Sequence, residues 1–256
     1  MLGAIAGDVI GSVYEHRQIK TTDFPLFDVR CQFTDDTVMT VAIAHAILAK
    51  SDYGASLQAY GRRYPNAGYG GAFYNWLFQA NATPYNSWGN GSAMRVSPVG
   101  FAFAGVEDVL REAGRTAEVS HNHPEGIKGA QATALAVFLA RQGESKQVIK
   151  QEIVERFGYN LDRTVEDIRP NYAFDVSCQG TVPEALIAFL DSTDYEDAVR
   201  KAVSLGGDSD TLACITGGVA QAFYKAVPAH IADSVRRVLP HEFLDTIDRF
   251  TQTFGL

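Results

Sequence analysis

Apolar residues recur along this chain mainly at helical spacing, and sustained alternation of apolar and polar residues, the pattern of strands, is nearly absent. Two stretches, Val38 to about Lys50 and Asp210 to Val227, are apolar on almost every face, which predicts buried central helices. Further helices are expected over residues 2–14, 55–64, 72–79, 92–103, 106–113, 127–141, 146–157, 229–238 and 242–250. The pattern therefore predicts an all-α fold, with residues 1–256 forming a single compact domain of many helices packed at steep angles.

Several local signals set the ends of these helices. Gly143 is a typical C-cap after residues 127–141, and Pro98 is expected to kink the segment 92–103. The spacings Thr181-Val182-Pro183-Glu184 and Thr193-Asp194-Tyr195-Glu196 match capping boxes, so we expect helices to begin there. Residues 18–33 have the composition of a loop, and residues 160–172 give no clear pattern.

Gly3, Gly7 and Gly11 are four residues apart in the first expected helix. On a helix they form one bare stripe that allows the backbone of another element to approach closely. Because the segment is short and contains Asp8, it predicts a tightly packed helix of a soluble protein rather than a membrane span.

The composition narrows the class of protein. The chain is 46% hydrophobic and 20% charged, which is ordinary for a globular domain. Its net charge of −8 and the lack of a run of Lys and Arg argue against a nucleic-acid surface. Three cysteines without a CxxC spacing argue against a disulfide framework. The start of the chain lacks a signal-peptide pattern, and no stretch is long and apolar enough for a bilayer, so we expect a cytoplasmic protein without membrane partners.

Two acidic clusters precede the two buried helices. The first is Phe33-Thr34-Asp35-Asp36-Thr37 and the second is Gly207-Asp208-Ser209-Asp210-Thr211. One Asp at a helix start is ordinarily an N-cap. Each cluster, however, has two carboxylates with neighbouring hydroxyls, and crowded carboxylates favour a bound cation. We therefore expect the fold to bring both clusters to one metal site.

Such a site offers only hard oxygen ligands, which suit Mg²⁺, Mn²⁺ or Ca²⁺ better than zinc. Two ions at the usual two-metal separation of about 3.5–4 Å could share these carboxylates, with Asp210 as a bridging ligand.

Four segments together resemble the ADP-ribosylglycohydrolase family. They are Gly3-Ala4-Ile5-Ala6-Gly7-Asp8-Val9-Ile10-Gly11-Ser12-Val13-Tyr14-Glu15, Phe33-Thr34-Asp35-Asp36-Thr37, Gly89-Asn90-Gly91-Ser92-Ala93-Met94-Arg95-Val96 and Gly206-Gly207-Asp208-Ser209-Asp210-Thr211. The resemblance implies an all-α fold with a binuclear Mg²⁺ site in a central cleft, Mn²⁺ being the alternative ion. It implies as metal ligands Thr34, Asp35, Asp36, Asp208, Asp210 and Thr211. Ser209 is not expected to bind metal.

The resemblance also implies hydrolysis of the bond between ADP-ribose and an acceptor. Tyr14-Glu15 looks like the branch of the family that cleaves O-linked ADP-ribose, so Glu15 is expected to act on the attacking water. Asp35 and Asp36 remain open as alternative catalytic carboxylates. We expect the ribose hydroxyls to bind at the metal ions, and an oxocarbenium-like transition state as in glycosidases.

Two loops are implied to bind the rest of the substrate. Tyr69, Gly70 and Gly71 belong to a Gly-rich stretch that lacks the lysine of a P-loop and is expected over the diphosphate. Ser87-Trp88-Gly89-Asn90-Gly91 matches the loop that cradles the diphosphate and proximal ribose, and relatives often have Tyr in place of Trp88. The resemblance also places His121 near the phosphates.

The expected partner is an ADP-ribosylated protein or a small ADP-ribose conjugate. Two alternatives remain open, namely a non-catalytic relative that binds ADP-ribose and a two-metal phosphohydrolase. Phosphohydrolases of that kind commonly use a His-Asp dipeptide, and no His here is followed by Asp. The sequence leaves the acceptor linkage and the oligomeric state open.

Overall fold

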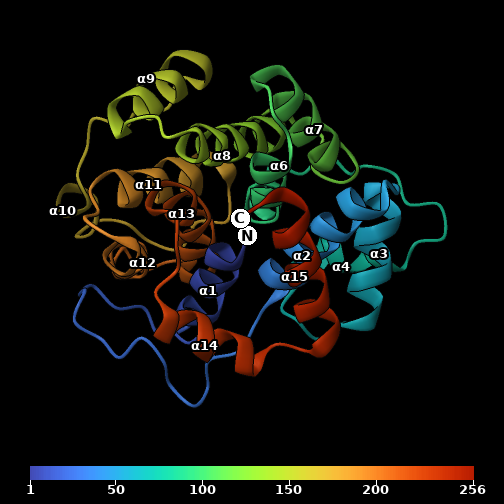
Figure 1. Cartoon of the computed structure of the whole chain (residues 1–256), viewed down its shortest axis with the longest axis horizontal. Coiled ribbons are helices and arrows are strands. Elements are labelled where there is room, and N and C mark those ends of the chain that lie inside the picture. The colour runs from blue at the N-terminus through green and yellow to red at the C-terminus, as the bar shows by residue number, and fades with distance from the viewer.

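Fifteen helices and no β-sheet make up the computed structural model, which describes all residues from Met1 to Leu256 (Figure 1). The helices are α1 (Leu2–Gly11), α2 (Asp35–Ala49), α3 (Tyr53–Arg63), α4 (Gly71–Phe78), α5 (Gly91–Met94), α6 (Ser97–Ala102), α7 (Val106–Glu118), α8 (Pro124–Gln142), α9 (Lys146–Phe157), α10 (Val165–Ile168), α11 (Cys178–Leu190), α12 (Tyr195–Ser204), α13 (Ser209–Tyr224), α14 (Ala229–Val238) and α15 (His241–Phe254). The prediction of an all-α domain is confirmed. None of the fifteen helices combines the length and the apolar character that a membrane crossing requires.

Helix α13 lies at the centre of the packing. It contacts α1 along its length and is also packed against α8, α11 and α12, which surround it in Figure 1. Helix α2 packs against α3 and α15 on the other side of α1. As predicted, α2 and α13 are buried on nearly all faces. Their N-termini carry the two acidic clusters, so the core itself holds these clusters in place.

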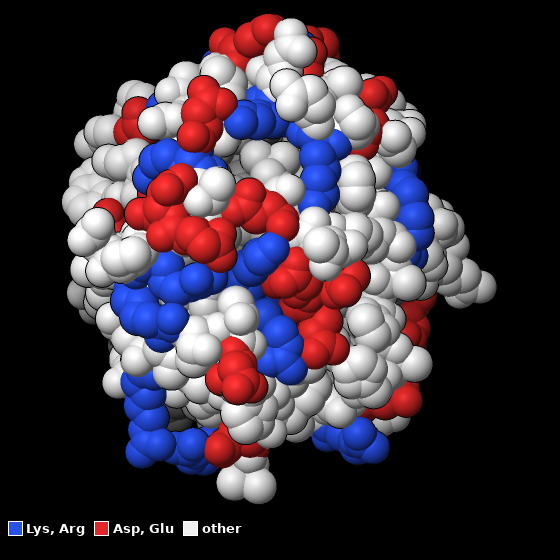
Figure 2. All heavy atoms as spheres, turned by 90° about the vertical axis from the view of Figure 1, so that its left-hand side faces the viewer, with Lys and Arg blue, Asp and Glu red and all other residues white.

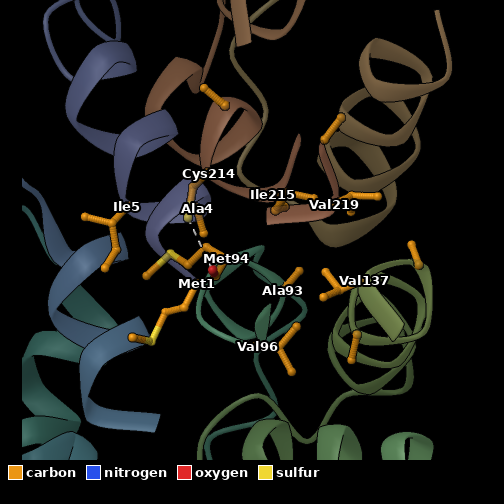
Figure 3. Packing of buried hydrophobic residues seen from close by; sticks show 14 of the residues in the cluster. Met1, Ala4, Ile5, Ala93, Met94, Val96, Val137, Cys214, Ile215 and Val219 are labelled. Carbon is orange, nitrogen blue, oxygen red and sulfur yellow. Dashed lines mark hydrogen bonds between the residues drawn. The ribbon is translucent and has the colours of Figure 1, made fainter. Parts of the chain in front are cut away.

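The apolar core is continuous between these helices (Figure 3). Met94, at the end of α5, lies among side chains of α1 and α13, and its carbonyl accepts a hydrogen bond from the Sγ of Cys214 at 3.3 Å. Val137 of α8 and Ile215 and Val219 of α13 fill the neighbouring part of the core. The three cysteines are unpaired thiols.

The glycine stripe of α1 lies against the backbone of another element, as the sequence predicts, and that element is α13. A Cβ atom at Gly7 would overlap the backbone of Ala213, and one at Gly11 would overlap that of Ser209. The two helix backbones therefore approach more closely than any side chain would allow. This approach brings the end of α1 beside the start of α13.

Several predicted boundaries shift. Helix α1 ends at Gly11 rather than at residue 14, and the segment 92–103 forms two short helices, α5 and α6, with Pro98 in the first turn of α6. Proline is favoured in the first turn because its missing N–H has no helical partner there. Helix α7 extends to Glu118, and residues 160–172 contain only the single turn of α10. The predicted C-cap at Gly143 is confirmed by its left-handed backbone, with φ of 88°.

The capping box predicted at Thr181 is wrong. Helix α11 begins at Cys178, and the hydroxyl of Ser177 caps it by accepting from the N–H of Gly180 at 3.0 Å. Thr181 lies inside the helix, where its hydroxyl donates to the carbonyl of Asp175 at 3.0 Å. Pro183 is therefore an interior proline of α11.

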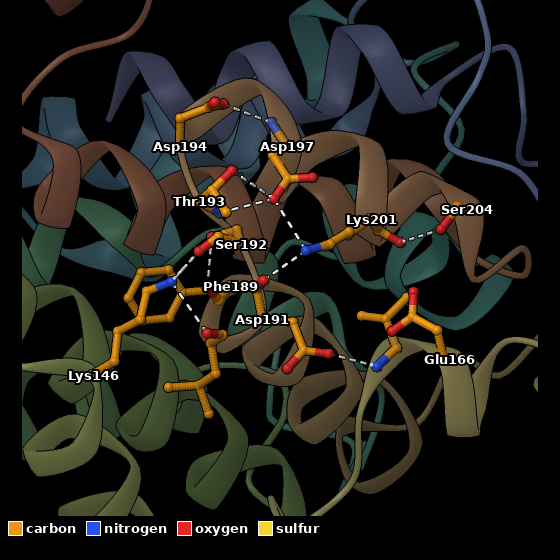
Figure 4. Close-up of polar contacts among 12 residues, drawn as sticks. Lys146, Glu166, Phe189, Asp191, Ser192, Thr193, Asp194, Asp197, Lys201 and Ser204 are labelled. Carbon is orange, nitrogen blue, oxygen red and sulfur yellow. Dashed lines mark hydrogen bonds and ion pairs between the residues drawn. The ribbon is translucent and has the colours of Figure 1, made fainter.

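The capping box predicted at Thr193 is displaced by one residue. Asp194 is the N-cap of α12, and its Oδ1 accepts from the N–H of Asp197 at 2.9 Å (Figure 4). Thr193 instead donates its N–H to Oδ2 of Asp197 at 2.8 Å. Beside this turn, Lys146 and Lys201 donate to carbonyls at the end of α11, which would otherwise be free.

Candidate metal centre and substrate cleft

Asp8 of α1 connects the first acidic cluster to the centre of the fold. Its carboxylate accepts the N–H of Thr34 at 3.0 Å and the hydroxyl of Thr34 at 2.7 Å. It also accepts the N–H of Thr37 at 3.1 Å and the hydroxyl of Thr37. Burial raises the pKa of Asp8 to about 6, against the opposing effect of these hydrogen bonds. No role for Asp8 was predicted from the sequence, although it lies in the first matching segment.

The second cluster is fixed to the same helix. The hydroxyl of Ser209 donates to the carbonyl of Gly11 at 3.1 Å, at the end of α1. The hydroxyl proton of Ser209 is thereby directed at the backbone of α1. Helix α1 therefore contacts the starts of both α2 and α13.

The two acidic clusters meet, as the sequence predicts. The hydroxyl of Thr211 donates to Oδ2 of Asp36 at 3.3 Å. Carboxylate oxygens of Glu15, Asp208 and Asp210 lie within 4.8 Å of one another. Residues from the beginning and the end of the chain thus share one acidic site.

Helix capping explains only part of this cluster. The hydroxyl of Thr34 caps α2 by accepting from the N–H of Asp36 at 3.3 Å. Asp208 precedes α13 but its side chain makes no capping hydrogen bond. The crowding of carboxylates therefore needs a further explanation.

The cluster carries negative charge that no protein cation compensates. Burial, and next the neighbouring carboxylates, raise the pKa values of Asp35, Asp36 and Asp210 well above the usual range for aspartate. No Lys or Arg forms an ion pair with any of these aspartates or with Asp208. In addition, Oδ1 of Asp36 is buried without a hydrogen-bond partner. Crowded carboxylates without a cationic partner, flanked by hydroxyls, fit a site for hard divalent cations.

Glu15 lies at the mouth of this cluster, just beyond the end of α1. Its side chain is 27% exposed and lies 3.7 Å from the Nε2 of His16. Burial raises the pKa of Glu15, and the nearby charge of Asp208 acts in the same direction. Glu15 therefore faces both the acidic cluster and solvent.

A cleft of about 850 Å³ opens onto the acidic cluster. Most of the predicted site residues line it, namely Glu15, Thr34, Asp35, Asp36, Gly70, Gly71, Ser87, Gly89, Asn90, Gly91, His121, Asp208, Asp210 and Thr211. Tyr69 and Trp88 are not among its lining residues. The hydroxyl of Tyr69 is buried without a partner, and Trp88 is 48% exposed.

The loop at Gly89–Gly91 joins the cleft to the acidic cluster. Asn90 donates from Nδ2 to Oδ2 of Asp208 at 2.7 Å and to the hydroxyl of Thr181 at 3.1 Å. Because the side chain of Asn90 is committed to these two groups, it holds an aspartate of the cluster as well as shaping the loop. His121 lies against the same loop, and a Cβ atom at Gly91 would lie 3.0 Å from its Nε2.

Part of the cleft wall was not predicted from the sequence. Phe174 and Val176 line the cleft and are half exposed, and Phe73, Tyr85 and Arg95 line its interior. Phe174 and Val176 lie in an irregular segment whose position depends on the isolated bridge between Gly89 and Ser177. An apolar pair just before a helix was the only sequence signal for them.

The surface outside the cleft carries both signs of charge. Figure 2 shows acidic and basic side chains interspersed on the side that bears α10 and α12. Ion pairs such as Arg200–Glu196 at 2.8 Å and Lys201–Asp197 at 3.0 Å account for part of this mixture. This face presents no continuous basic surface of the kind that binds nucleic acids.

Comparison with known proteins gives a consistent result. The family model described as ADP-ribosylglycohydrolase matches residues 1–255. The chain is 26% identical to ADP-ribosylhydrolase ARH3 of Homo sapiens over 304 residues, covering 88% of this chain and 84% of that protein. It is also 26% identical to ADP-ribosylarginine hydrolase Tri1 of Pseudomonas putida, covering 88% of this chain and 69% of that protein. A solved structure titled "ADP-ribosylglycohydrolase-related protein complex" shares the fold, with a TM-score of 0.67, 24% identity and coverage of 93% and 96% of the two chains.

Proposed function

The chain belongs to the ADP-ribosylglycohydrolase family, and on this premise we propose that it hydrolyses the glycosidic bond between ADP-ribose and an acceptor. The proposed acceptor is a protein side chain or an O-acyl group, and the released product is ADP-ribose. The reaction would depend on divalent cations, Mg²⁺ or Mn²⁺. The observation that carries this proposal is the meeting of two buried acidic clusters, without a compensating Lys or Arg, at one end of a large cleft.

The proposed ligands of two such ions are Thr34, Asp35, Asp36, Asp208, Asp210 and Thr211. When bound, the cations would supply positive charge that holds and polarises the ribose hydroxyls. Asp8 keeps Thr34 oriented, because the hydroxyl proton of Thr34 is donated to Asp8 at 2.7 Å and a lone pair of the oxygen stays free. Asn90 has the corresponding role for Asp208.

Glu15 is the proposed general base. It holds the attacking water at the mouth of the cluster and accepts its proton as the oxygen attacks C1 of the ribose. The bond from C1 to the acceptor breaks in the same oxocarbenium-like step, and the acceptor leaves with the bonding electron pair and takes up a proton from solvent. Asp35 and Asp36 are the alternative carboxylates for this step, but both lie within the proposed ligand set, and Asp36 is buried whereas Glu15 is partly exposed.

The remainder of ADP-ribose would extend along the cleft. The backbone N–H groups of Gly70, Gly71 and Gly91, which donate to no group of the protein, suit a diphosphate, as does the imidazole of His121. The half-exposed rings of Trp88 and Phe174 are suited to contact the adenine at the rim. Binding along this path leaves the acceptor at the open end near Glu15.

The test uses ADP-ribosylated proteins and small ADP-ribose conjugates with defined linkages. The chain is incubated with Mg²⁺ or Mn²⁺, or with EDTA, and free ADP-ribose is measured. Release that requires metal supports the proposal. The Tyr14-Glu15 pair leads us to expect faster release from O-linked serine and O-acetyl conjugates than from arginine. ADP-ribose binding without release would indicate a non-catalytic relative, and AMP or phosphate as product would indicate a phosphohydrolase.

A further inference from the structure

Ser120 lies between a buried arginine and the histidine of the cleft. Nη2 of Arg95 donates to Oγ of Ser120 at 3.0 Å, and the same oxygen lies 2.8 Å from Nδ1 of His121. Arg95 and Ser120 are both fully buried. The three side chains therefore form a continuous chain of hydrogen bonds from the interior of the protein to the cleft.

The donors and acceptors of this chain determine which nitrogen of His121 carries its proton. A guanidinium only donates, so the hydroxyl of Ser120 must accept from Arg95. The single proton of Ser120 is then available to Nδ1 of His121, which has to be unprotonated to accept it. If Nδ1 carried the proton instead, the buried hydroxyl of Ser120 would accept twice and leave its own proton without a partner. Buried donors are rarely left unpaired, because no water replaces the lost bond.

The other ring nitrogen of His121 faces the substrate cleft. No protein group is hydrogen-bonded to Nε2, which lies beside the Gly89–Gly91 loop. The ring is held from the sides by Phe73 and Tyr85, whose ring centroids lie 6.0 Å and 5.8 Å away. A proton on Nε2 is therefore directed toward the proposed diphosphate site.

We propose that Arg95 and Ser120 are positioning residues that fix His121 as its Nε2–H tautomer, so that the ring donates a hydrogen bond to the diphosphate of ADP-ribose. The choice of ligand rests on the proposed function, whereas the tautomer follows from the protein alone. In this arrangement His121 is always a donor toward the anion. The opposite tautomer would direct a lone pair at the phosphate oxygens and repel them.

Two features of Arg95 support this assignment. Its Nη2 also donates to the carbonyl of Thr116 at 2.7 Å, which fixes the guanidinium at the end of α7. It forms no ion pair with a carboxylate, and its Nε and Nη1 have no partner. Burial, and next the positive charge of Arg95, lowers the pKa of the His121 imidazole, so the ring stays neutral. A neutral ring has two tautomers, and Ser120 selects between them.

The experiment measures the tautomer and the affinity separately. Two-dimensional ¹⁵N NMR of the histidine-labelled full chain, at neutral pH without ligand, should show His121 with a protonated Nε2 and an accepting Nδ1. The signal is assigned by its loss in His121→Gln. In Ser120→Ala the Nδ1 acceptor signature should be lost. The dissociation constant for ADP-ribose, measured by calorimetry, should rise about 3- to 10-fold, as expected for one hydrogen bond.

Ser120→Thr keeps the hydroxyl and should restore both the tautomer and the affinity. His123 is an internal control, because its Nδ1 accepts from the N–H of Glu125 at 3.1 Å independently of Ser120. Its signal should not change in Ser120→Ala. In kinetic assays Ser120→Ala should have a higher KM than wild type and a kcat within about 2-fold of it, because the chain of hydrogen bonds lies away from Glu15.

A wild-type His121 protonated at Nδ1 would overturn the proposal whether or not any variant folds. An unchanged tautomer and affinity in Ser120→Ala would also overturn it. If the wild-type chain shows the Nε2–H tautomer but does not bind ADP-ribose, the proposed function fails while the assignment of the tautomer stands.

Discussion

The hydroxyl of Thr211 donates to the carboxylate of Asp36 over 3.3 Å, although the two residues are 175 positions apart in the chain. This contact joins the start of α13 to the start of α2. It exists because the glycine face of α1 lets α13 approach closely while Asp8, on the same helix, holds the start of α2. The proposed metal centre is therefore a direct product of the packing of three helices.

Removing one carboxylate from the acidic cluster should raise the melting temperature of the metal-free protein and reduce its stabilisation by Mg²⁺. In Asp36→Asn the mutual repulsion of the buried carboxylates decreases, so we expect the metal-free variant to unfold at a higher temperature than wild type. Each kcal/mol of stabilisation corresponds to about 2–4 °C for a chain of this size. Wild type should gain about 2.7 kcal/mol at a Mg²⁺ concentration 100 times its dissociation constant, and the variant much less. Differential scanning calorimetry with Mg²⁺ or EDTA measures both effects.

Asp233→Asn is the matched control for this experiment. Asp233 is exposed on α14 and makes no hydrogen bond, so its substitution should change neither the melting temperature nor the response to Mg²⁺. A metal-free Asp36→Asn that is less stable than wild type, with an undiminished response to Mg²⁺, would contradict the proposed role of Asp36.

Glu15→Gln tests the proposed general base. The amide keeps the size of the side chain but cannot accept the proton of water, so we expect the rate of ADP-ribose release to fall by about 10²- to 10⁴-fold. Binding of ADP-ribose and of Mg²⁺ should change by less than about 3-fold, because Glu15 is outside the proposed ligand set. Rapid-quench assays and calorimetry measure these quantities. Glu118→Gln, at an exposed position of α7, is the control, and an unchanged kcat in Glu15→Gln would transfer the role to Asp35 or Asp36.

Gly7→Ala tests the contact between α1 and α13. Because the new Cβ would overlap the backbone of Ala213, the helices must separate. We expect the free energy of unfolding to fall by about 1–3 kcal/mol, as for other overpacked cores. Gly71→Ala, where a Cβ meets no atom within 4 Å, should be neutral or slightly stabilising. Equal stabilities of the two variants in urea denaturation would show that the close approach is not required.

Much of this arrangement could be predicted from local sequence. The apolar faces of α2 and α13 and the glycine spacing of α1 depend only on residues close in the chain, and all three are confirmed. The acidic clusters were recognisable because carboxylates and hydroxyls were repeated before two buried helices, and these clusters do come together.

What could not be predicted depends on contacts between distant segments. Ser177 rather than Thr181 caps α11, because the Thr181 hydroxyl is occupied by Asp175 and Asn90. Phe174 enters the cleft wall from a segment without periodicity. The chain of hydrogen bonds through Ser120 is likewise invisible in sequence, because Arg95 reaches it from 25 positions away.

The neutral state of His121 has a consequence for stability in mild acid. Burial, and next the charge of Arg95, hold the pKa of His121 well below its usual value. The aromatic rings beside it, Phe73 and Tyr85, carry no negative charge, because burial raises the pKa of Tyr85 to about 12. In the unfolded chain this histidine takes up a proton as the pH falls through about 6.5, whereas in the folded chain it does not. The free energy of unfolding should therefore decrease below pH 6.5, by at most about 1.36 kcal/mol per pH unit from this group.

Because other groups titrate as well, the measurement is the difference between wild type and His121→Gln in urea denaturation from pH 7.5 to 5.5, both with EDTA. Wild type should lose stability relative to the variant across this range, and the ¹⁵N signals of His121 should not move above pH 6. A titration of His121 near pH 6.5 in the folded protein, with parallel stability curves, would contradict the prediction and show that the ring is free to become charged beside Arg95.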